Sequence, residues 1–298
     1  MLILSALLLL SSVSCSKDKE KTEPQESKEE FYSLENVSYG EEARQEFDMV
    51  MPRKNANGGV IVMIHGGAWS DGGKDELNYM NRNFYRDGFT FATINYRFAS
   101  DKLDMDDLLD DITSALKKIQ QTAKEYGIEL TDLMLGGISA GGQMALLYSY
   151  SRRDVSPITV RCCVGMSAVC DMTAESVWID TPLDKYMSAN HKMVNVGSHL
   201  CGFDFDKTNF KEAVPYLEKI SPLFYAGSAV PTILAHGVED DIIKYDTAVS
   251  LYNALTENGT DCSFISFSRS GHLLESDPSC KINLNLKIEE YAEKYLTH

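Results

Sequence analysis

Apolar residues along the chain fall into two patterns, short continuous runs and one-sided stripes. The runs are rich in valine, isoleucine and leucine, as expected for strands buried on both faces of a sheet. They cover residues 59–64, 90–96, 132–136, 160–166, 231–235 and 262–267. The striped segments, typical of helices, cover residues 104–126, 247–257 and 283–296. This alternation predicts an α/β fold with a mostly parallel sheet covered by helices on both sides.

One long segment, residues 171–228, interrupts the alternation between two predicted strands. It carries Trp178, Pro182, Tyr186, His191 and Pro215 without a clear repeat of either pattern. Long excursions inside a compact domain often shape a binding pocket. We expect an inserted lid of short helices and loops; the alternative is an excursion that never touches a substrate.

The length and charge of the chain narrow its domain count and its partners. With 298 residues, 44% of them hydrophobic, the chain can bury one large core, which we place at residues 33–298. The formal net charge is -16. Binding to nucleic acid needs clustered lysine and arginine, so no nucleic-acid partner is expected.

The first 32 residues have the composition of a targeting segment and a tether. Residues 1–15 hold a short apolar run followed by small residues and Cys15. The run is too short to span a bilayer, and it resembles a bacterial lipoprotein signal with Cys15 as the lipidated residue. Ordinary secretion and a buried N-terminal helix are the alternatives. Residues 16–32 are expected to be a disordered tether, giving an exported protein that meets the membrane only through its lipid anchor.

The remaining cysteines show no metal-binding pattern. They are Cys162, Cys163, Cys170, Cys201, Cys262 and Cys280. None has the CxxC or Cys/His spacing of a zinc site, so no metal is expected. In an oxidising compartment Cys262 and Cys280 could pair around the loop that carries His272, which the sequence leaves open.

Residues 137–141 read GISAG and join a predicted strand to a predicted helix. Such a sharp turn needs small residues, because its central residue is held in a strained backbone conformation. Gly137 and Gly141 supply the clearance, so Ser139 is expected to present its hydroxyl above the sheet edge. This arrangement indicates a serine nucleophile. The helix that starts at Ala140 points its N-terminus towards the reacting centre.

A second motif, HGGAW at residues 65–69, follows the run at 59–64. A glycine pair lets backbone N–H groups face a cavity, where with the N–H of Ala140 they would hold the oxyanion of an acyl-transfer intermediate. Gly67 is the main expected donor, and either Gly66 or Ala68 is the second. His65 is expected to brace the loop by hydrogen bonding. A turn without function is the alternative.

A serine nucleophile requires an imidazole base and an acid that orients it. With a GxSxG elbow both partners follow Ser139 in the chain, on loops after later strands. Of the six histidines, His272 follows the run at 262–267 and is the expected base. Asp240 is the expected acid, with Asp241 and Glu239 as rivals in the same acidic loop.

These motifs together resemble a known family. HGGAW, INYRF, GISAGG, HGVEDD and GHLL occur in the order found in α/β-hydrolases of the esterase/lipase group, across residues 37–296. HGGAW followed by GGKD is similar to the branch containing carbohydrate feruloyl and acetyl esterases and formamidases. The resemblance implies an α/β-hydrolase fold with a small lid, and gives Ser139, Asp240 and His272 the triad roles. Ala68 departs from the HGGG pattern.

The resulting prediction is a serine hydrolase that cleaves carboxylic esters through an acyl-enzyme and needs no cofactor. Its substrate would be a small-molecule or oligosaccharide ester, such as an acetylated or feruloylated glycan outside the cytoplasm. An amidase or peptidase using the same triad is the second hypothesis. A non-catalytic binding protein with this fold is the third.

Overall fold

The computed structural model describes residues 30–81, 84–185, 187 and 192–296. Residues 1–29, with the predicted signal and Cys15, lie outside these ranges, so lipidation and most of the predicted tether stay predictions. Within the described residues, no helix is long and apolar enough to cross a bilayer. The tether boundary at residue 32 is wrong, because Phe31 and Tyr32 already belong to the first strand.

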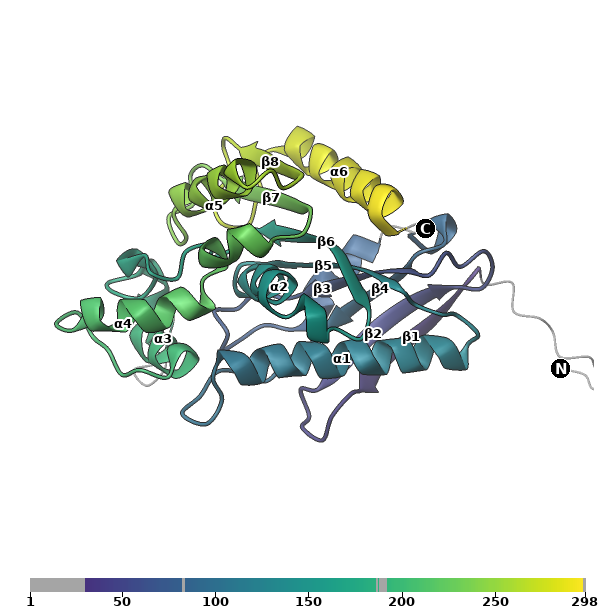
Figure 1. The fold of residues 1–298 in the computed structure, drawn as a ribbon, viewed down its shortest axis with the longest axis horizontal. Coiled ribbons are helices and arrows are strands. Elements are labelled where there is room, and N and C mark those ends of the chain that lie inside the picture. Colours follow the sequence, from purple (N-terminus) through teal and green to yellow (C-terminus); the bar gives the residue numbers. More distant parts are fainter. Residues whose placement is uncertain (1–29, 82–83, 186, 188–191, 297–298) are drawn as a thin grey trace, which may run out of the picture.

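The core of the molecule is an eight-stranded sheet (Figure 1). Its strands are β1 (Phe31–Ser38), β2 (Glu46–Pro52), β3 (Gly59–Ile64), β4 (Thr90–Ile94), β5 (Asp132–Ile138), β6 (Thr159–Met166), β7 (Thr232–Gly237) and β8 (Cys262–Phe267). Their spatial order is β1-β2-β4-β3-β5-β6-β7-β8. The β1–β2 and β2–β4 pairs are antiparallel, and all the others are parallel.

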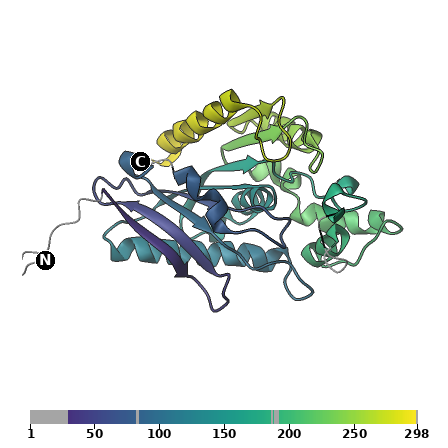
Figure 2. The same ribbon diagram turned by 180° about the vertical axis from the view of Figure 1, so that it is seen from behind.

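Helices cover both faces of the sheet. The α-helices are α1 (Met105–Glu125), α2 (Ala140–Ser151), α3 (Met193–Cys201), α4 (Phe210–Leu217), α5 (Tyr245–Glu257) and α6 (Pro278–Leu296). Apolar residues of α1, α2 and α5 join one buried cluster with the sheet. Those of α6 and the 3-10 helices η1 (Lys74–Asn81) and η2 (Phe84–Asp87) join a second cluster. Figure 2 shows α6 and the two N-terminal strands from behind.

The ends of α1 follow directly from the sequence. Asp104 is its N-cap and forms a reciprocal capping box with Asp107, which satisfies two backbone N–H groups that a helix start leaves unpaired. Its apolar stripe is buried. After the C-cap Tyr126 comes Gly127 with a φ of 79°, a backbone conformation that glycine adopts without steric cost.

The segment between β6 and β7 projects from one end of the sheet, as Figure 1 shows for α3 and α4. Besides these helices it holds the 3-10 helices η4 (Glu175–Val177), η5 (Pro182–Lys185), η7 (Glu218–Ile220) and η8 (Pro222–Ser228). The predicted α/β-hydrolase architecture, with a mostly parallel sheet, flanking helices and an inserted lid, is therefore confirmed.

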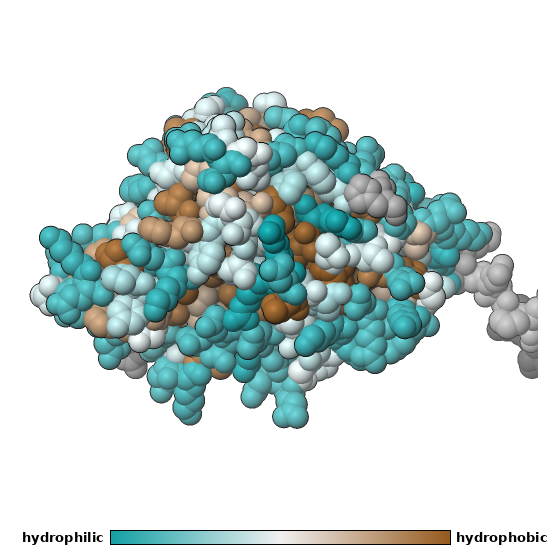
Figure 3. Space-filling model, viewed as in Figure 1, coloured by the Kyte–Doolittle hydropathy of each residue, from teal (hydrophilic) through white to brown (hydrophobic). Residues whose placement is uncertain are grey.

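The surface of the molecule reflects its net charge. The face drawn in Figure 3 is mostly hydrophilic, in keeping with the net charge of -16, with hydrophobic residues gathered in its middle.

The six cysteines in the described ranges are free thiols, so the disulfide between Cys262 and Cys280 that the sequence left open does not form. Burial raises the pKa of the Cys163 thiol to about 11, as expected for a cysteine that acts as a small core residue.

Candidate active site

Ser139 lies at the tight turn where β5 passes into α2. Its φ of 55° and ψ of -121° lie outside the regions that residues with side chains prefer. The neighbouring backbones approach so closely that a Cβ on Gly137 would lie 2.5 Å from the carbonyl carbon of Gly141. A Cβ on Gly141 would lie 2.2 Å from the Ile64 carbonyl oxygen. Both glycines are therefore required by space, as the sequence pattern predicts.

The structure brings the predicted base and acid to this serine. The Nε2 atom of His272 lies 2.9 Å from the Ser139 Oγ, and its Nδ1 atom lies 2.8 Å from the Asp240 Oδ2. These residues follow β5, β7 and β8. Carboxyl ends of parallel strands meet at one edge of a sheet, the usual place for a site in open α/β folds.

The charge state of Asp240 fixes the tautomer of His272. Although burial opposes a charge there, hydrogen bonds from His236 and His272 hold the pKa of the Asp240 carboxyl below its usual range. An ionised carboxylate only accepts hydrogen bonds, so the Nδ1 atom of His272 carries the proton and donates it. The Nε2 atom is then free to accept the Ser139 hydroxyl proton. The arrangement has the geometry of a nucleophile, base and acid relay.

Asp240 has a second imidazole partner that the sequence reasoning missed. The His236 Nε2 lies 3.1 Å from the Asp240 Oδ2 and 2.9 Å from the Ile243 carbonyl oxygen. Both partners are acceptors, so this nitrogen is the donor. The other carboxylate oxygen, Oδ1, accepts the N–H groups of Ile242 and Ile243, each at 2.9 Å. The spacing of four residues between His236 and Asp240 was the available signal.

Asp241 and Glu239, the rival acids, do not enter this network. Both are exposed, whereas Asp240 is 5% exposed. Neither rival is hydrogen-bonded to His272; the carboxylate that holds the ring belongs to Asp240. The geometry therefore favours Asp240 over both rivals.

The loop that carries His272 is held from two sides by residues that the sequence did not single out. Ser167, directly after β6, donates its hydroxyl to the His272 carbonyl oxygen at 2.7 Å. Within the loop, Asp277 accepts hydrogen bonds from the Ser270 hydroxyl at 2.8 Å and from the Arg269 N–H at 2.9 Å. These hydrogen bonds fix the loop, and with it the position of the His272 imidazole.

Two of the predicted oxyanion residues, Gly66 and Gly67, line a pocket beside Ser139. Gly67 has a φ of 107°, and a Cβ there would lie 2.0 Å from the Asp71 carbonyl oxygen, so only glycine fits. Among the described residues, the N–H groups of Gly67 and Ala140 have no acceptor and remain available. Ala68 takes a φ of 50°, a backbone conformation that residues with a side chain rarely adopt. Gly66 directs its carbonyl towards the imidazole of His65, with 2.6 Å between the oxygen and Nδ1.

A buried glutamine joins the loop after β3, which carries Gly67 and Trp69, to the inserted segment. Gln143 on α2 is fully buried; its Oε1 accepts the Trp69 indole N–H at 3.0 Å, and its Nε2 donates to the Ile220 carbonyl at 2.8 Å. Trp69 also stacks on Trp178, with 5.7 Å between ring centroids. The loop after β3 and the inserted segment are therefore connected through Gln143 and through the Trp69–Trp178 stack.

A cavity of about 300 Å³ opens beside Ser139 and His272. The residues that line it are Gly66, Gly67, Ala68, Ser70, Asp71, Glu76, Ile138, Ser139, Leu183, Met187, His272 and Leu273. Leu183 and Met187 come from the inserted segment, so this segment forms part of the wall. Contact between the insertion and a substrate stays a prediction.

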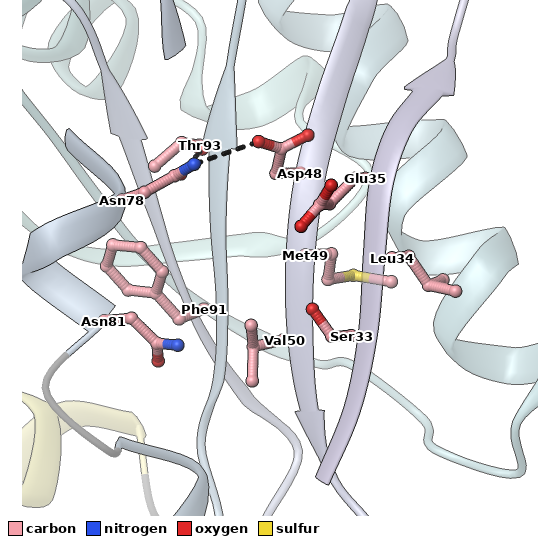
Figure 4. A pocket seen from close by; sticks show the side chains of 10 residues that line it. All are labelled: Ser33, Leu34, Glu35, Asp48, Met49, Val50, Asn78, Asn81, Phe91 and Thr93. Carbon is pink, nitrogen blue, oxygen red and sulfur yellow. Dashed lines mark hydrogen bonds between the residues drawn. The ribbon is translucent and has the colours of Figure 1, made fainter. Parts of the chain in front are cut away.

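A second, smaller hollow of about 170 Å³ lies over β1, β2 and β4 (Figure 4). Asn78 donates to Asp48 at 3.1 Å, and the Thr93 hydroxyl donates to Asn78 at 2.7 Å. Lys74 reaches the same carboxylate from η1, with 3.0 Å between Nζ and Oδ1. These polar groups satisfy one another and hold η1 against the sheet, a structural role.

A model of the BD-FAE family matches residues 47–255, well over half of the chain. The chain belongs to the BD-FAE family. This is a family of α/β-hydrolase esterases, so the expected family and enzyme class, the carboxylic ester hydrolases, are confirmed.

Solved structures share the fold of this BD-FAE protein at low sequence identity. A truncated carbohydrate esterase from gut microbiota has a TM-score of 0.69 at 17% identity, covering 90% of this chain and 99% of that one. An esterase of Thermogutta terrifontis, solved with butyrate, has a TM-score of 0.65 at 18% identity, covering 87% of this chain and 93% of that one. These likenesses establish the α/β-hydrolase architecture.

Among curated proteins, kynurenine formamidase of Danio rerio is 26% identical over 129 residues. The alignment covers 42% of this chain and 42% of the relative. The BD-FAE protein thus matches less than half of that relative's length.

Proposed function

We propose that Ser139 is the nucleophile of a serine esterase that works through a covalent acyl-enzyme. The observation that carries this proposal is the continuous hydrogen-bonded series from Ser139 through His272 to Asp240, with distances of 2.9 and 2.8 Å. A neutral imidazole in this position can take the serine proton while the ionised acid stabilises the imidazolium that forms.

The reaction follows in two halves. His272 removes the Ser139 proton as the serine oxygen attacks the ester carbonyl carbon, and the N–H groups of Gly67 and Ala140 bind the oxyanion. The intermediate collapses, the ester C–O bond breaks, and the alcohol leaves with the proton returned by His272. Water then attacks the acyl-enzyme in the same way, releasing the acid and restoring the serine hydroxyl.

The cavity supports a substrate with an acetyl or aromatic acyl group and a hydroxylated alcohol. Its apolar wall, formed by Ile138, Leu183 and Leu273, suits an acetyl or aromatic acyl group, and Asp71 and Glu76 can accept hydrogen bonds from hydroxyl groups. We propose an acetylated or feruloylated glycan as the substrate. The carbohydrate esterase from gut microbiota with a similar fold agrees with this substrate class.

Hydrolysis of an amide by the same residues is the second candidate function. It is favoured by the partial similarity to a kynurenine formamidase. The triad and the oxyanion donors serve both reactions, so the leaving group decides between them.

A substrate panel tests these assignments. It contains nitrophenyl esters of increasing acyl length, the matched anilides, and acetylated and feruloylated oligosaccharides. We expect ester turnover far above anilide turnover; hydrolysis of anilides but not of esters would reverse the ranking. Labelling with a fluorophosphonate should place one adduct on Ser139, and a folded protein that takes up no label would favour a binding protein without catalysis.

We also propose that the protein acts outside the cytoplasm, attached to the envelope by a lipid on Cys15. The apolar run and cysteine of residues 1–15 support this location. Fractionation tests it: Cys15→Ala should move the protein from the membrane fraction to the soluble fraction. An unchanged distribution would contradict the lipid anchor.

A further inference from the structure

Arg44 lies in the turn between β1 and β2, which is fastened at both ends to the rest of the molecule. The Tyr39 hydroxyl donates to the Asn95 carbonyl at 2.7 Å. The side chain of Gln45 donates to Asp111 on α1 at 2.8 Å. The turn therefore presents the half-buried Arg44 from a fixed backbone.

The guanidinium of Arg44 contacts both the loop that begins at His65 and the segment that follows β4. Its Nε donates to the Tyr96 carbonyl at 2.9 Å, and its Nη2 donates to the Gly72 carbonyl at 3.0 Å. The group lies 3.8 Å from the centre of the Phe98 ring, a cation–π contact. The same Nη2 lies 3.1 Å from the His65 Nε2.

This last contact decides the tautomer of His65. A guanidinium has only donors, so the His65 Nε2 must accept the hydrogen bond from Arg44. A neutral imidazole then carries its proton on Nδ1. That nitrogen lies 2.6 Å from the Gly66 carbonyl oxygen and donates to it.

The orientation of the Gly66 carbonyl sets the direction of the next N–H group. In a trans peptide the carbonyl and the following N–H point in opposite directions. With its carbonyl held by the buried His65, the Gly66–Gly67 peptide directs the Gly67 N–H away from the imidazole. The cavity lined by Gly67 and Ser139 lies next to this peptide.

The environment of His65 keeps the ring neutral. Burial is the main cause that lowers its pKa to about 4; the charge of Arg44 lowers it further, while the Gly66 carbonyl and Asp71 oppose the shift. The ring also stacks on Tyr96, with 4.5 Å between centroids. At neutral pH the series from Arg44 to Gly66 therefore has one arrangement of protons.

We propose that Arg44 is a positioning residue: acting through His65, it fixes the peptide that presents the Gly67 N–H to the oxyanion. The inference rests on the proposed esterase mechanism. Arg44 lies outside residues 47–255, the part of the chain that the family model matches. The role thus belongs to the N-terminal hairpin of this chain.

The test compares Arg44→Met and Arg44→Lys with the control Arg86→Met, which changes an arginine whose side chain is 61% exposed. We expect Arg44→Met to lower kcat for nitrophenyl ester hydrolysis about 10- to 100-fold with little change in KM, because the donor acts mainly on the transition state. Inhibition by a trifluoromethyl ketone, whose serine adduct carries an oxyanion, should weaken by a similar factor. Arg86→Met should match the wild type.

Arg44→Lys provides a second reading if Arg44→Met fails to fold. Its ammonium can donate to His65 but lacks the planar fork that also reaches Gly72 and Tyr96, so an intermediate kcat is expected. A folded Arg44→Met or Arg44→Lys with wild-type kcat and wild-type ketone inhibition would overturn the inference. So would a loss confined to KM. Ser139→Ala, assayed alongside, separates the two hypotheses, since full activity there contradicts the esterase mechanism itself.

Discussion

The His272 Nε2 lies 2.9 Å from the Ser139 Oγ although 133 positions separate the two residues along the chain. The contact exists because β5 and β8 run in the same direction and end at the same edge of the sheet. The strained turn raises the serine above that edge, and the loop after β8 carries the imidazole to it.

Ser139→Ala and His272→Ala should each reduce kcat on a nitrophenyl ester on the order of a millionfold, the scale seen when a serine protease loses its nucleophile or base. Each change removes an atom on which both halves of the reaction depend. Circular dichroism should show that both variants fold. Retention of a tenth of the wild-type rate by either one would assign the role to another residue.

Asp240→Asn should lower kcat by about 10⁴-fold. The amide that replaces the carboxylate cannot accept from His236, His272 and two backbone N–H groups at once, and it carries no charge to stabilise the imidazolium. Asp241→Asn is the matched control, because the neighbouring carboxylate is exposed and should be replaceable with less than a twofold change. Equal losses in the two variants would remove Asp240 from the acid position.

How far the sequence predicts the fold depends on the strength of each local pattern. The run at residues 59–64 coincides with β3, and the stripe at 104–126 coincides with α1 and its caps. The pattern did not reveal β1 and β2. No residue of strand β1 is fully buried and its apolar residues do not alternate cleanly, so its pairing with β2 depends on tertiary contacts that no local signal encodes.

The residues of the site also divide into those with a local signal in the sequence and those without one. Ser139, Gly67 and His272 have local signals, because a strained turn and a close backbone approach restrict which residues fit. Arg44 has none: it reaches His65 only after the hairpin folds over the loop. His236 was visible as a residue four positions before Asp240, but its donor role depends on the turn that follows β7.

Gln143→Leu should lower the free energy of unfolding by about 2–4 kcal/mol, because it leaves the Trp69 indole N–H and the Ile220 carbonyl buried without partners. Gln121→Leu, on the exposed side of α1, is the matched control and should stay within about 0.5 kcal/mol. Urea unfolding measures both. Because Trp69 lies in the same loop as Gly67, kcat should also fall in Gln143→Leu. Equal stability of the two variants would show that water replaces the missing amide.

His65 should make the stability of the protein depend on pH in a defined window. Its pKa is lowered from 6.5 to about 4 in the folded protein, mainly by burial and also by the charge of Arg44, with Asp71 acting in the opposite direction. As the pH falls through 6.5, the unfolded chain takes up a proton that the folded protein refuses until about pH 4. Stability is therefore lost across this window as the pH falls, by about 3 kcal/mol for this group. Below pH 4 its contribution becomes constant.

The non-titrating variant His65→Asn isolates this contribution, since its amide can still donate to the Gly66 carbonyl. Urea unfolding of both proteins at pH 7 and at pH 4.5 should show a wild-type stability that falls more steeply than that of His65→Asn. Other carboxyl groups titrate in both proteins and cancel in the comparison. Parallel losses in the two proteins would mean that His65 is protonated in the folded state at pH 4.5, and that Arg44 does not hold it in the neutral form.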